Sequence, residues 1–397
     1  MNLKISFFII IACISMLSAQ EKDIWTPPQK DSLLTMLDDM YNLEFDKFDQ
    51  KLVRYRQRFP ERPEGRFAHV MAWWMKVTAD IYNPKYDTIF ETKLDSIIED
   101  LERYDEDDPL FPVAEFYSNS ATGFKAIMHV TRENWWSAAL EGRIAVRGIE
   151  KALEGKIPNP DARFGTGLYL YYADRIPRRY PILKPLFLFY PDGDKERGLN
   201  DLLETTQNGV FAKVVASYMY AVILYTREDK HQQAYEIMHS LVERYPQNPT
   251  FLMWLASMAT RVGKYQEAQN SLDVYLKRTE SGKPYYPRSK LVMAYFRYGS
   301  LLYKEGEFER ALYFLDKAVA EDGLPESSYL ERFKAYAMLQ RGYCLEKLSR
   351  MDDAEKAFEN VLEMPEYHDS HQQAKQHLER IIKMQMRQEK RRSSTSK

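Results

Sequence analysis

Residues 214–246 read VVASYMYAVILYTREDKHQQAYEIMHSLVERYP, and this stretch decides the fold. Two amphipathic helical patterns meet at a polar turn formed by residues 227–230. Ala234, a small residue, lies five positions after Asp229, within the second pattern. Apolar residues that recur with the period of an α-helix on both sides of a polar turn predict an antiparallel helix pair.

The same arrangement recurs three times downstream. The small residues that mark it are 34, 43 and 43 residues apart, namely Ala234, Ala268, Ala311 and Ala354. Large apolar residues follow four positions later, at Met238, Leu272, Leu315 and Phe358, and further core positions follow at Leu241, Tyr275, Ala318 and Val361. Twelve residues before each small residue lies the expected helix crossing, at Val222, Ala256, Gly299 and Gly342. Because small residues let two helices approach closely, we expect Gly299 to pack against Ala311 and Gly342 against Ala354.

A 34-residue helix–turn–helix unit with small residues at its crossing resembles the tetratricopeptide repeat. The first copy also ends on Tyr245 and Pro246, and this repeat carries a proline at its end. The resemblance implies an all-α fold, a right-handed superhelical solenoid of about eight antiparallel helix pairs with a C-terminal capping helix. It also implies a scaffold that binds another protein or peptide through its concave groove.

The N-terminus has the layout of a cleaved secretory signal peptide. Lys4 precedes an apolar run over residues 5–17, and Ala19 precedes a polar stretch. The run is shorter than a membrane span needs, so we expect no transmembrane segment after cleavage. Cys13 lies too early in the run for a lipoprotein site. The sequence therefore predicts an exported protein, periplasmic or extracellular, that is able to associate with the cell envelope.

The pattern divides the chain into five parts. We expect a signal peptide at 1–19, degenerate helix pairs at 20–208 with an aromatic insertion at 176–193, four regular repeats at 209–365, a capping helix at 366–386, and a basic disordered tail at 387–397. In the first degenerate pair Phe48 stands where the later copies have alanine. Asp194 is placed to cap a helix over residues 195–206.

Composition excludes several classes of function. The chain has 56 basic and 58 acidic residues, and removal of Lys4 with the signal peptide makes its net charge about −3, which argues against nucleic-acid binding. Only Cys344 remains after cleavage, so no intramolecular disulfide forms, and its setting predicts a small buried side chain.

The sequence predicts no catalytic residues, no cofactor and no metal site. It contains no nucleophile elbow, zinc-protease motif or phosphate-binding glycine loop. His368, His371 and His377 form the strongest metal-ligand candidate, but a solvated turn that enters the last helix explains them better. The chain is therefore predicted not to be an enzyme.

Two rows of residues are expected along the groove. Fifteen positions before each marker alanine the sequence is apolar, with Met219, Met253, Phe296 and Leu339. Seven positions before it the sequence is basic, with Arg227, Arg261, Lys304 and Lys347. The basic row is either a set of helix C-terminal residues favoured by the helix dipole or a site for carboxylates of an extended acidic partner.

The aromatic region 131–191 provides an alternative site. It contains Trp135, Trp136, Tyr169 and Tyr172 among several prolines, and an insertion this apolar must pack on something. Either it covers the helices beside it, or it forms a site for a peptide, a sugar ring or a lipid, as in a carbohydrate- or lipid-binding accessory protein. Residues 164–199, with Gly165, Gly167 and a G-D-x-x-x-G-L helix start at Gly193, are similar to part of the inclusion-body-clearance tetratricopeptide family.

Overall fold

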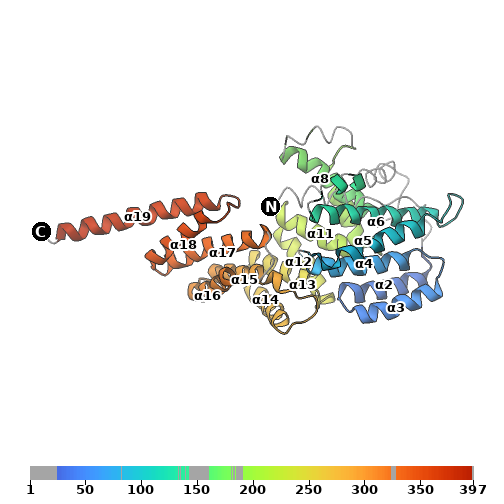
Figure 1. Cartoon of the computed structure of the whole chain (residues 1–397), viewed down its shortest axis with the longest axis horizontal. Coiled ribbons are helices and arrows are strands. Elements are labelled where there is room, and N and C mark those ends of the chain that lie inside the picture. Colours follow the sequence, from blue (N-terminus) through green and yellow to red (C-terminus); the bar gives the residue numbers. More distant parts are fainter. Residues whose placement is uncertain are drawn as a thin grey trace. The chain divides into compact units, whose positions relative to one another are not determined.

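The computed structural model describes residues 25–81, 83–132, 134, 136–138, 140–142, 161–179, 181, 184, 191–322 and 328–395. Throughout these ranges every regular element is a helix (Figure 1). The chain forms two compact units, residues 1–251 and 252–397. The expected signal peptide, 1–19, lies outside the described residues. Among the described helices, none combines the length and the apolar character needed to cross a bilayer.

Unit 1 is built from helices that pack against their neighbours in sequence (Figure 1). They are α2 (Pro27–Tyr41), α3 (Phe45–Arg58), α4 (Glu64–Ala79), the 3-10 helix η1 (Pro84–Tyr86), α5 (Asp87–Leu101), α6 (Phe111–Thr131), α8 (Ala162–Arg179), α10 (Lys195–Asn208), α11 (Lys213–Thr226) and α12 (His231–Arg244). Among the degenerate pairs expected over residues 20–208, α2 packs with α3 and α4 packs with α5. The all-α, paired-helix architecture predicted from the sequence is therefore confirmed.

The first pair follows directly from its sequence. Thr26 and Gln29 form a capping box at the start of α2, and Pro27 occupies the first helical turn, where a missing N–H costs nothing. Phe48 of α3 is fully buried at the position predicted for it, and Met36, twelve residues earlier, is fully buried too. A large crossing residue is therefore accommodated in this pair.

Unit 1 closes on itself, because the end of α2 contacts the segment that follows α12. The Asn248 side chain donates to the Tyr41 carbonyl at 2.9 Å, and the Gln247 amide donates to the Asn42 side chain at 3.0 Å. The rings of Tyr41 and Tyr245 lie 5.8 Å apart. In a simple solenoid each repeat contacts only its neighbours, so this contact adds a long-range closure to the predicted row of pairs.

The connection between α10 and α11 is inserted into the core of unit 1. The Phe211 ring lies 5.2 Å from that of Phe67 on α4 and 5.6 Å from that of Tyr117 on α6. The buried carboxylate of Asp161 accepts the backbone N–H groups of Val210, Phe211 and Ala212 at 2.8–3.0 Å. Burial raises the pKa of Asp161, and the three amide donors oppose that rise by stabilising its charge.

Glycine allows α8 and α10 to pack at short range. A Cβ atom on Gly167 would lie 2.9 Å from the Gly198 carbonyl oxygen, and one on Gly198 would lie 2.6 Å from the Tyr171 amide nitrogen. Asp194 caps α10 through the Arg197 amide at 3.0 Å, as predicted. Residues 161–208 therefore form one helix pair around the insertion, and half of the insertion lies outside the described residues.

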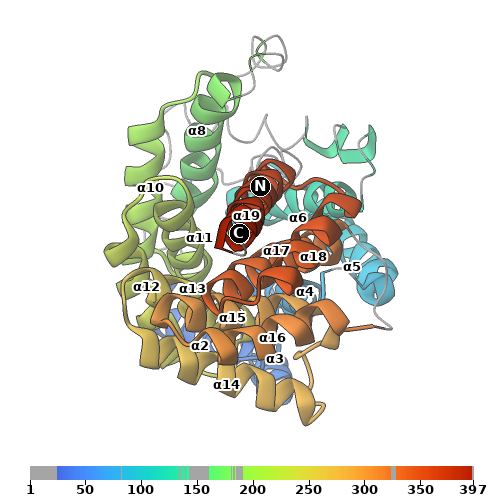
Figure 2. The same cartoon turned by 90° about the vertical axis from the view of Figure 1, so that its left-hand side faces the viewer.

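Helix α13 (Pro249–Arg261) begins just before the boundary at residue 251 and continues into unit 2. Unit 2 then contains α14 (Tyr265–Glu280), the 3-10 helix η3 (Arg288–Lys290), α15 (Leu291–Glu305), α16 (Phe308–Ala320), α17 (Ser328–Lys347), α18 (Met351–Glu363) and α19 (Ser370–Thr395). Figure 2 shows α15 beside α16 and α17, which it contacts. The four marker alanines are all fully buried, and Cys344 is buried as predicted.

Gly299 and Gly342 lie at helix crossings, as predicted, but their closest contacts differ from those expected. A Cβ atom on Gly299 would lie 2.6 Å from Leu315 Cγ, and one on Gly342 would lie 2.4 Å from the Phe358 ring. The Ala311 carbonyl oxygen is more distant, at 3.2 Å. The glycines therefore make room for the large side chains four residues after the marker alanines, because these side chains cover the opposing helix.

The turn of each regular pair carries a left-handed residue at one fixed place. Five positions before each marker residue, φ is positive: 58° at Leu43, 51° at Asp229, 79° at Gly263, 83° at Gly306 and 58° at Ser349. The next amide usually bonds a carbonyl five residues back, as from Glu307 to Leu302 at 2.9 Å. This pattern is a common way to end a helix. The first pair shares it, which supports the register that placed Phe48.

The last helix packs through the residues that its periodicity indicates. Ala374 and Ile381 of α19 are fully buried, and α19 contacts both α17 and α18. His377 and Arg380 both bind the Glu346 carboxylate on α17. The helix continues to Thr395. The prediction of a disordered tail at 387–397 is therefore wrong for residues 387–395. The basic, serine-rich composition of the tail is compatible with the continuation of a helix whose earlier turns are packed against the protein.

Candidate protein-binding surface

Three exposed cations lie at the C-terminal ends of the first helices of successive pairs in unit 2. Arg261 is the last residue of α13, Lys304 the penultimate residue of α15 and Lys347 the last residue of α17. We call these three residues the basic row. The contact between α15 and α17 places the helices that carry Lys304 and Lys347 side by side.

The basic row is electrostatically uncompensated. Partial desolvation and then the nearby charge of Arg261 lower the pKa of the Lys304 ammonium group, so these two cations lie within electrostatic reach of each other. Within the described ranges, none of the three forms an ion pair. The helix dipole favours a cation at each of these positions, but it provides no counter-ion. The row is therefore able to receive carboxylates from another molecule.

The predicted apolar row is not an exposed strip. Met253 is 3% exposed and Leu339 is 7% exposed, while Met219 and Phe296 are half-buried. The first helices of neighbouring pairs contact each other, as α15 and α17 do, so side chains between them are covered. The expectation of partial exposure is wrong for Met253 and Leu339, because these residues belong to the core.

An aromatic cluster that the sequence analysis missed lies nearby. The Phe296 ring is 5.6 Å from that of Phe333 and 5.9 Å from that of Tyr336, and Tyr336 stacks at 6.3 Å on the ring of His368. The first three side chains are half-buried, and His368 is exposed. Phe333 and Tyr336 are three residues apart, which places them on one face of a helix. This spacing is the sequence signal that could have identified the cluster. We call these four residues the aromatic cluster.

Met219 and Arg227 belong to unit 1 and are described separately. Arg227 follows the last residue of α11, and its carbonyl accepts a hydrogen bond from Arg175 at 3.0 Å. Both side chains are half-buried. The equivalence of Arg227 to the three cations of unit 2 remains a prediction from the repeat register, and the basic row as defined here does not include it.

The alternative aromatic site is not assembled from the residues proposed for it. Tyr169 and Tyr172 are 1% and 6% exposed, and the Tyr169 hydroxyl donates to the Pro191 carbonyl at 2.6 Å. Trp136 is 77% exposed. Trp135 lies outside the described residues. The two tyrosines stabilise α8 within unit 1, which favours the interpretation that this region covers the helices beside it.

The C-terminal histidines bind different partners. His371 Nε2 lies 2.8 Å from the Met364 carbonyl oxygen, and His377 Nδ1 lies 2.7 Å from the Glu346 carboxylate. His368 adopts a left-handed conformation with φ of 55° in the turn before α19. These contacts fit the interpretation of a turn that enters the last helix.

Comparison with known families agrees with this geometry. A family model described as "Tetratricopeptide repeat" matches residues 215–248 and 336–364. The first match contains Ala234 and the second contains Gly342 and Ala354, the residues that mark the repeat. The chain carries tetratricopeptide repeats. Because the matched residues do not include 164–199, the similarity to the inclusion-body-clearance family stays a prediction.

Two solved structures share limited similarity with this chain. Yeast Tom70 is 12% identical, with 89% of each chain covered and a TM-score of 0.29. The tetratricopeptide domain of P58(IPK) is 13% identical, with 91% of this chain and 99% of that chain covered and a TM-score of 0.28. No curated protein matches the sequence.

Proposed function

We propose that this protein is an exported, non-catalytic scaffold that binds an extended acidic segment of another protein across α13, α15 and α17. The observation that carries the proposal is the basic row, in which three exposed cations, without ion-pair partners in the described part of the chain, lie at the C-terminal ends of successive first helices. Partial burial and then the charge of Arg261 lower the pKa of Lys304, and a carboxylate placed between the two cations would offset this repulsion.

The aromatic cluster defines a second requirement for the partner. Phe296 precedes Lys304 by eight residues and Tyr336 precedes Lys347 by eleven, which corresponds to about 12 and 16 Å along the helices. An extended chain covers this distance with about four or five residues. The partner segment should therefore carry an apolar or aromatic residue four or five positions away from its carboxylates.

Export is part of the proposal and rests on residues 1–19. The charged start, the apolar run and Ala19 match a cleaved signal peptide. The test is N-terminal sequencing of the protein isolated from its own cell. A mature chain that starts at about residue 20 is expected, whereas a chain that still begins at Met1 and remains inside the cell would refute this part.

Binding is tested with fluorescent peptides that combine one phenylalanine with three glutamates four or five positions away, compared with peptides that carry glutamine instead. We expect the acidic peptides to bind more tightly and to lose affinity as salt is raised, because exposed charges are screened over about 10 Å at 0.1 M. The triple variant R261Q/K304Q/K347Q should abolish the preference for glutamate.

A matched control comes from the second helices of the same three pairs. Lys277, Arg310 and Lys356 are exposed on α14, α16 and α18, and K277Q/R310Q/K356Q changes the net charge by the same amount. If both triple variants weaken binding equally, the effect is one of overall charge and the proposed surface is wrong. Circular dichroism of each variant verifies that the helices remain folded.

A further inference from the structure

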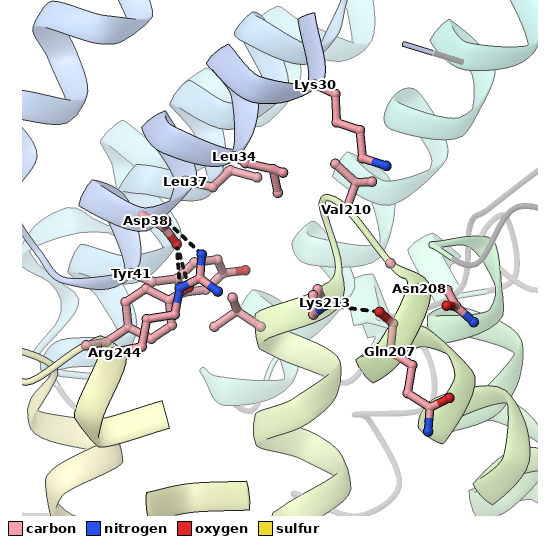
Figure 3. Close-up of a pocket in the computed structure, with 13 residues that line it drawn as sticks. Lys30, Leu34, Leu37, Asp38, Tyr41, Gln207, Asn208, Val210, Lys213 and Arg244 are labelled. Carbon is pink, nitrogen blue, oxygen red and sulfur yellow. Dashed lines mark hydrogen bonds and ion pairs between the residues drawn. The ribbon is translucent and has the colours of Figure 1, made fainter. Parts of the chain in front are cut away.

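A cavity of about 330 Å³ lies within unit 1 where the first helix meets α10, α11 and α12 (Figure 3). Its volume falls within the range of small-molecule sites. One wall is the face of α2, the opposite wall is the α10–α11 connection, and Arg244 and Tyr245 close one end. The cavity forms where unit 1 closes between α2 and the end of α12.

The cavity has an excess of positive charge. Lys30, Lys213 and Arg244 line it, whereas Asp38 is the only carboxylate among its lining residues. Asp38 is already held by Arg244 in a two-point ion pair. Lys213 donates to a neutral acceptor, the Gln207 carbonyl oxygen, at 3.0 Å. The charge of Lys30 reaches the buried carboxylate of Asp161, which already accepts three amide hydrogen bonds.

Tyr41 supplies an unused hydrogen-bonding group. Its side chain is 3% exposed and lines the cavity, and its buried hydroxyl has no hydrogen-bond partner among the residues that the structure describes. Figure 3 shows this hydroxyl directed from α2 toward the space in front of α11. A buried polar group without a partner costs about 1–3 kcal/mol, so an acceptor supplied by a ligand would remove an existing penalty.

The remaining wall is aliphatic. Leu34 and Leu37 line it from α2, Val210 lines it from the α10–α11 connection, and Val214 lines it from the first turn of α11. A free inorganic anion would leave these side chains without a contact. A carboxylate attached to a short aliphatic chain uses both parts of the cavity.

We propose that this cavity binds the carboxylate end of a short aliphatic ligand. The carboxylate lies between Lys30 and Lys213 and accepts the Tyr41 hydroxyl, and the aliphatic part contacts the leucine and valine side chains. Such a ligand is either a free carboxylic acid or the C-terminal residue of a peptide, which present the same chemistry. The inference does not depend on the function proposed for the basic row, because that surface lies in unit 2.

The experiment measures binding of four probes to the full mature chain by titration calorimetry and by two-dimensional NMR. The probes are hexanoate and its amide, and N-acetyl-alanyl-leucine and its C-terminal amide. We expect at least one acid to bind and its amide to fail, and the acid that binds more tightly distinguishes the two sources. The variants K30M and K213M should each weaken binding by about tenfold, the change expected for loss of one hydrogen bond to a charged group.

Two further variants separate a specific site from a general effect. Y41F removes only the unpartnered hydroxyl, so it should fold at least as well as the native protein and still bind the acid several-fold more weakly. K230M removes an exposed lysine at the start of α12, outside the cavity, and should bind as the native protein does. Equal binding of acid and amide, unchanged binding by K30M and K213M, or binding of no probe would overturn the proposal.

Discussion

The carboxylate of Asp38 accepts two hydrogen bonds from the guanidinium group of Arg244, from Nε at 3.1 Å and from Nη2 at 2.8 Å, although the two residues are 206 positions apart in the chain. The Tyr245 hydroxyl donates to the same carboxylate at 2.7 Å. One side chain of the first helix therefore fixes the end of α12, and unit 1 becomes a closed arrangement of helix pairs. The cavity beside Asp38 is a direct consequence of this closure.

The first prediction concerns the partners of Asp38. The Arg244 side chain is 56% exposed, so R244M should cost at most about 1 kcal/mol of unfolding free energy, as expected for a surface pair. D38A should cost more, about 1–3 kcal/mol, because it also leaves the hydroxyl of the buried Tyr245 without its acceptor. Denaturant unfolding measures both. Adding Y245F to D38A should recover part of the loss, whereas a larger cost for R244M than for D38A would contradict this explanation.

The second prediction concerns the helix crossings. G299L and G342L should each lower the free energy of unfolding by about 1–3 kcal/mol or more, because even a Cβ atom at either position would overlap Leu315 or Phe358. Thermal unfolding followed by circular dichroism checks the loss. In a double-mutant cycle, F358A should reduce the cost of G342A, since it removes the side chain that the glycine accommodates. Unchanged melting temperatures for both leucine variants would mean that the register is wrong.

The third prediction concerns the left-handed turns. Gly306 has φ of 83° and open space around its Cβ direction, so G306A should cost about 1–2 kcal/mol through backbone conformation alone. Ser349 occupies the equivalent place with φ of 58°, so S349G should leave stability unchanged or increase it. In chemical unfolding, G306A should lose stability and S349G should not, whereas a loss of stability in both variants would show that the turns are not equivalent.

The fourth prediction concerns acid stability. Burial, followed by the charges of Lys93, Arg56 and Lys76, lowers the pKa of His69 to about 4 from its ordinary 6.5. Between these values the unfolded chain binds a proton that the folded chain does not. The free energy of unfolding therefore falls as the pH decreases from about 6.5 to about 4.

The variant H69Q removes this titration, so its stability should decline less than that of the native protein between about pH 7 and pH 5. The half-buried His239 on α12 provides the matched control, as H239Q leaves the His69 environment on α4 unchanged. Melting temperatures across this range provide the comparison. Parallel pH profiles for the native protein and H69Q would show that His69 does not remain neutral in the folded state.

Local sequence determined the helix pairs. The period of the apolar residues specifies which side of each helix is buried, and a small or left-handed residue at a fixed offset specifies where two helices cross and turn. Gly299 and Gly342 therefore marked the helix crossings correctly, although the side chains closest to them are Leu315 and Phe358 rather than the marker alanines. Even Phe48 was placed by counting, because the turn geometry that sets the offset does not depend on the crossing residue.

Only the tertiary structure determined which residues cover each face of a helix. Met253 and Leu339 each lie fifteen positions before a marker alanine, and this offset does not distinguish an exposed residue from a buried one. Whether they are buried depends on how closely the neighbouring helices approach. The aromatic cluster joins helices and a turn that are not adjacent in sequence. The closure of unit 1 pairs Asp38 with Arg244, and no local period encodes a contact across 206 residues. Short-range patterns fix the conformation of one helix pair, whereas a binding surface or a cavity requires the packing of several.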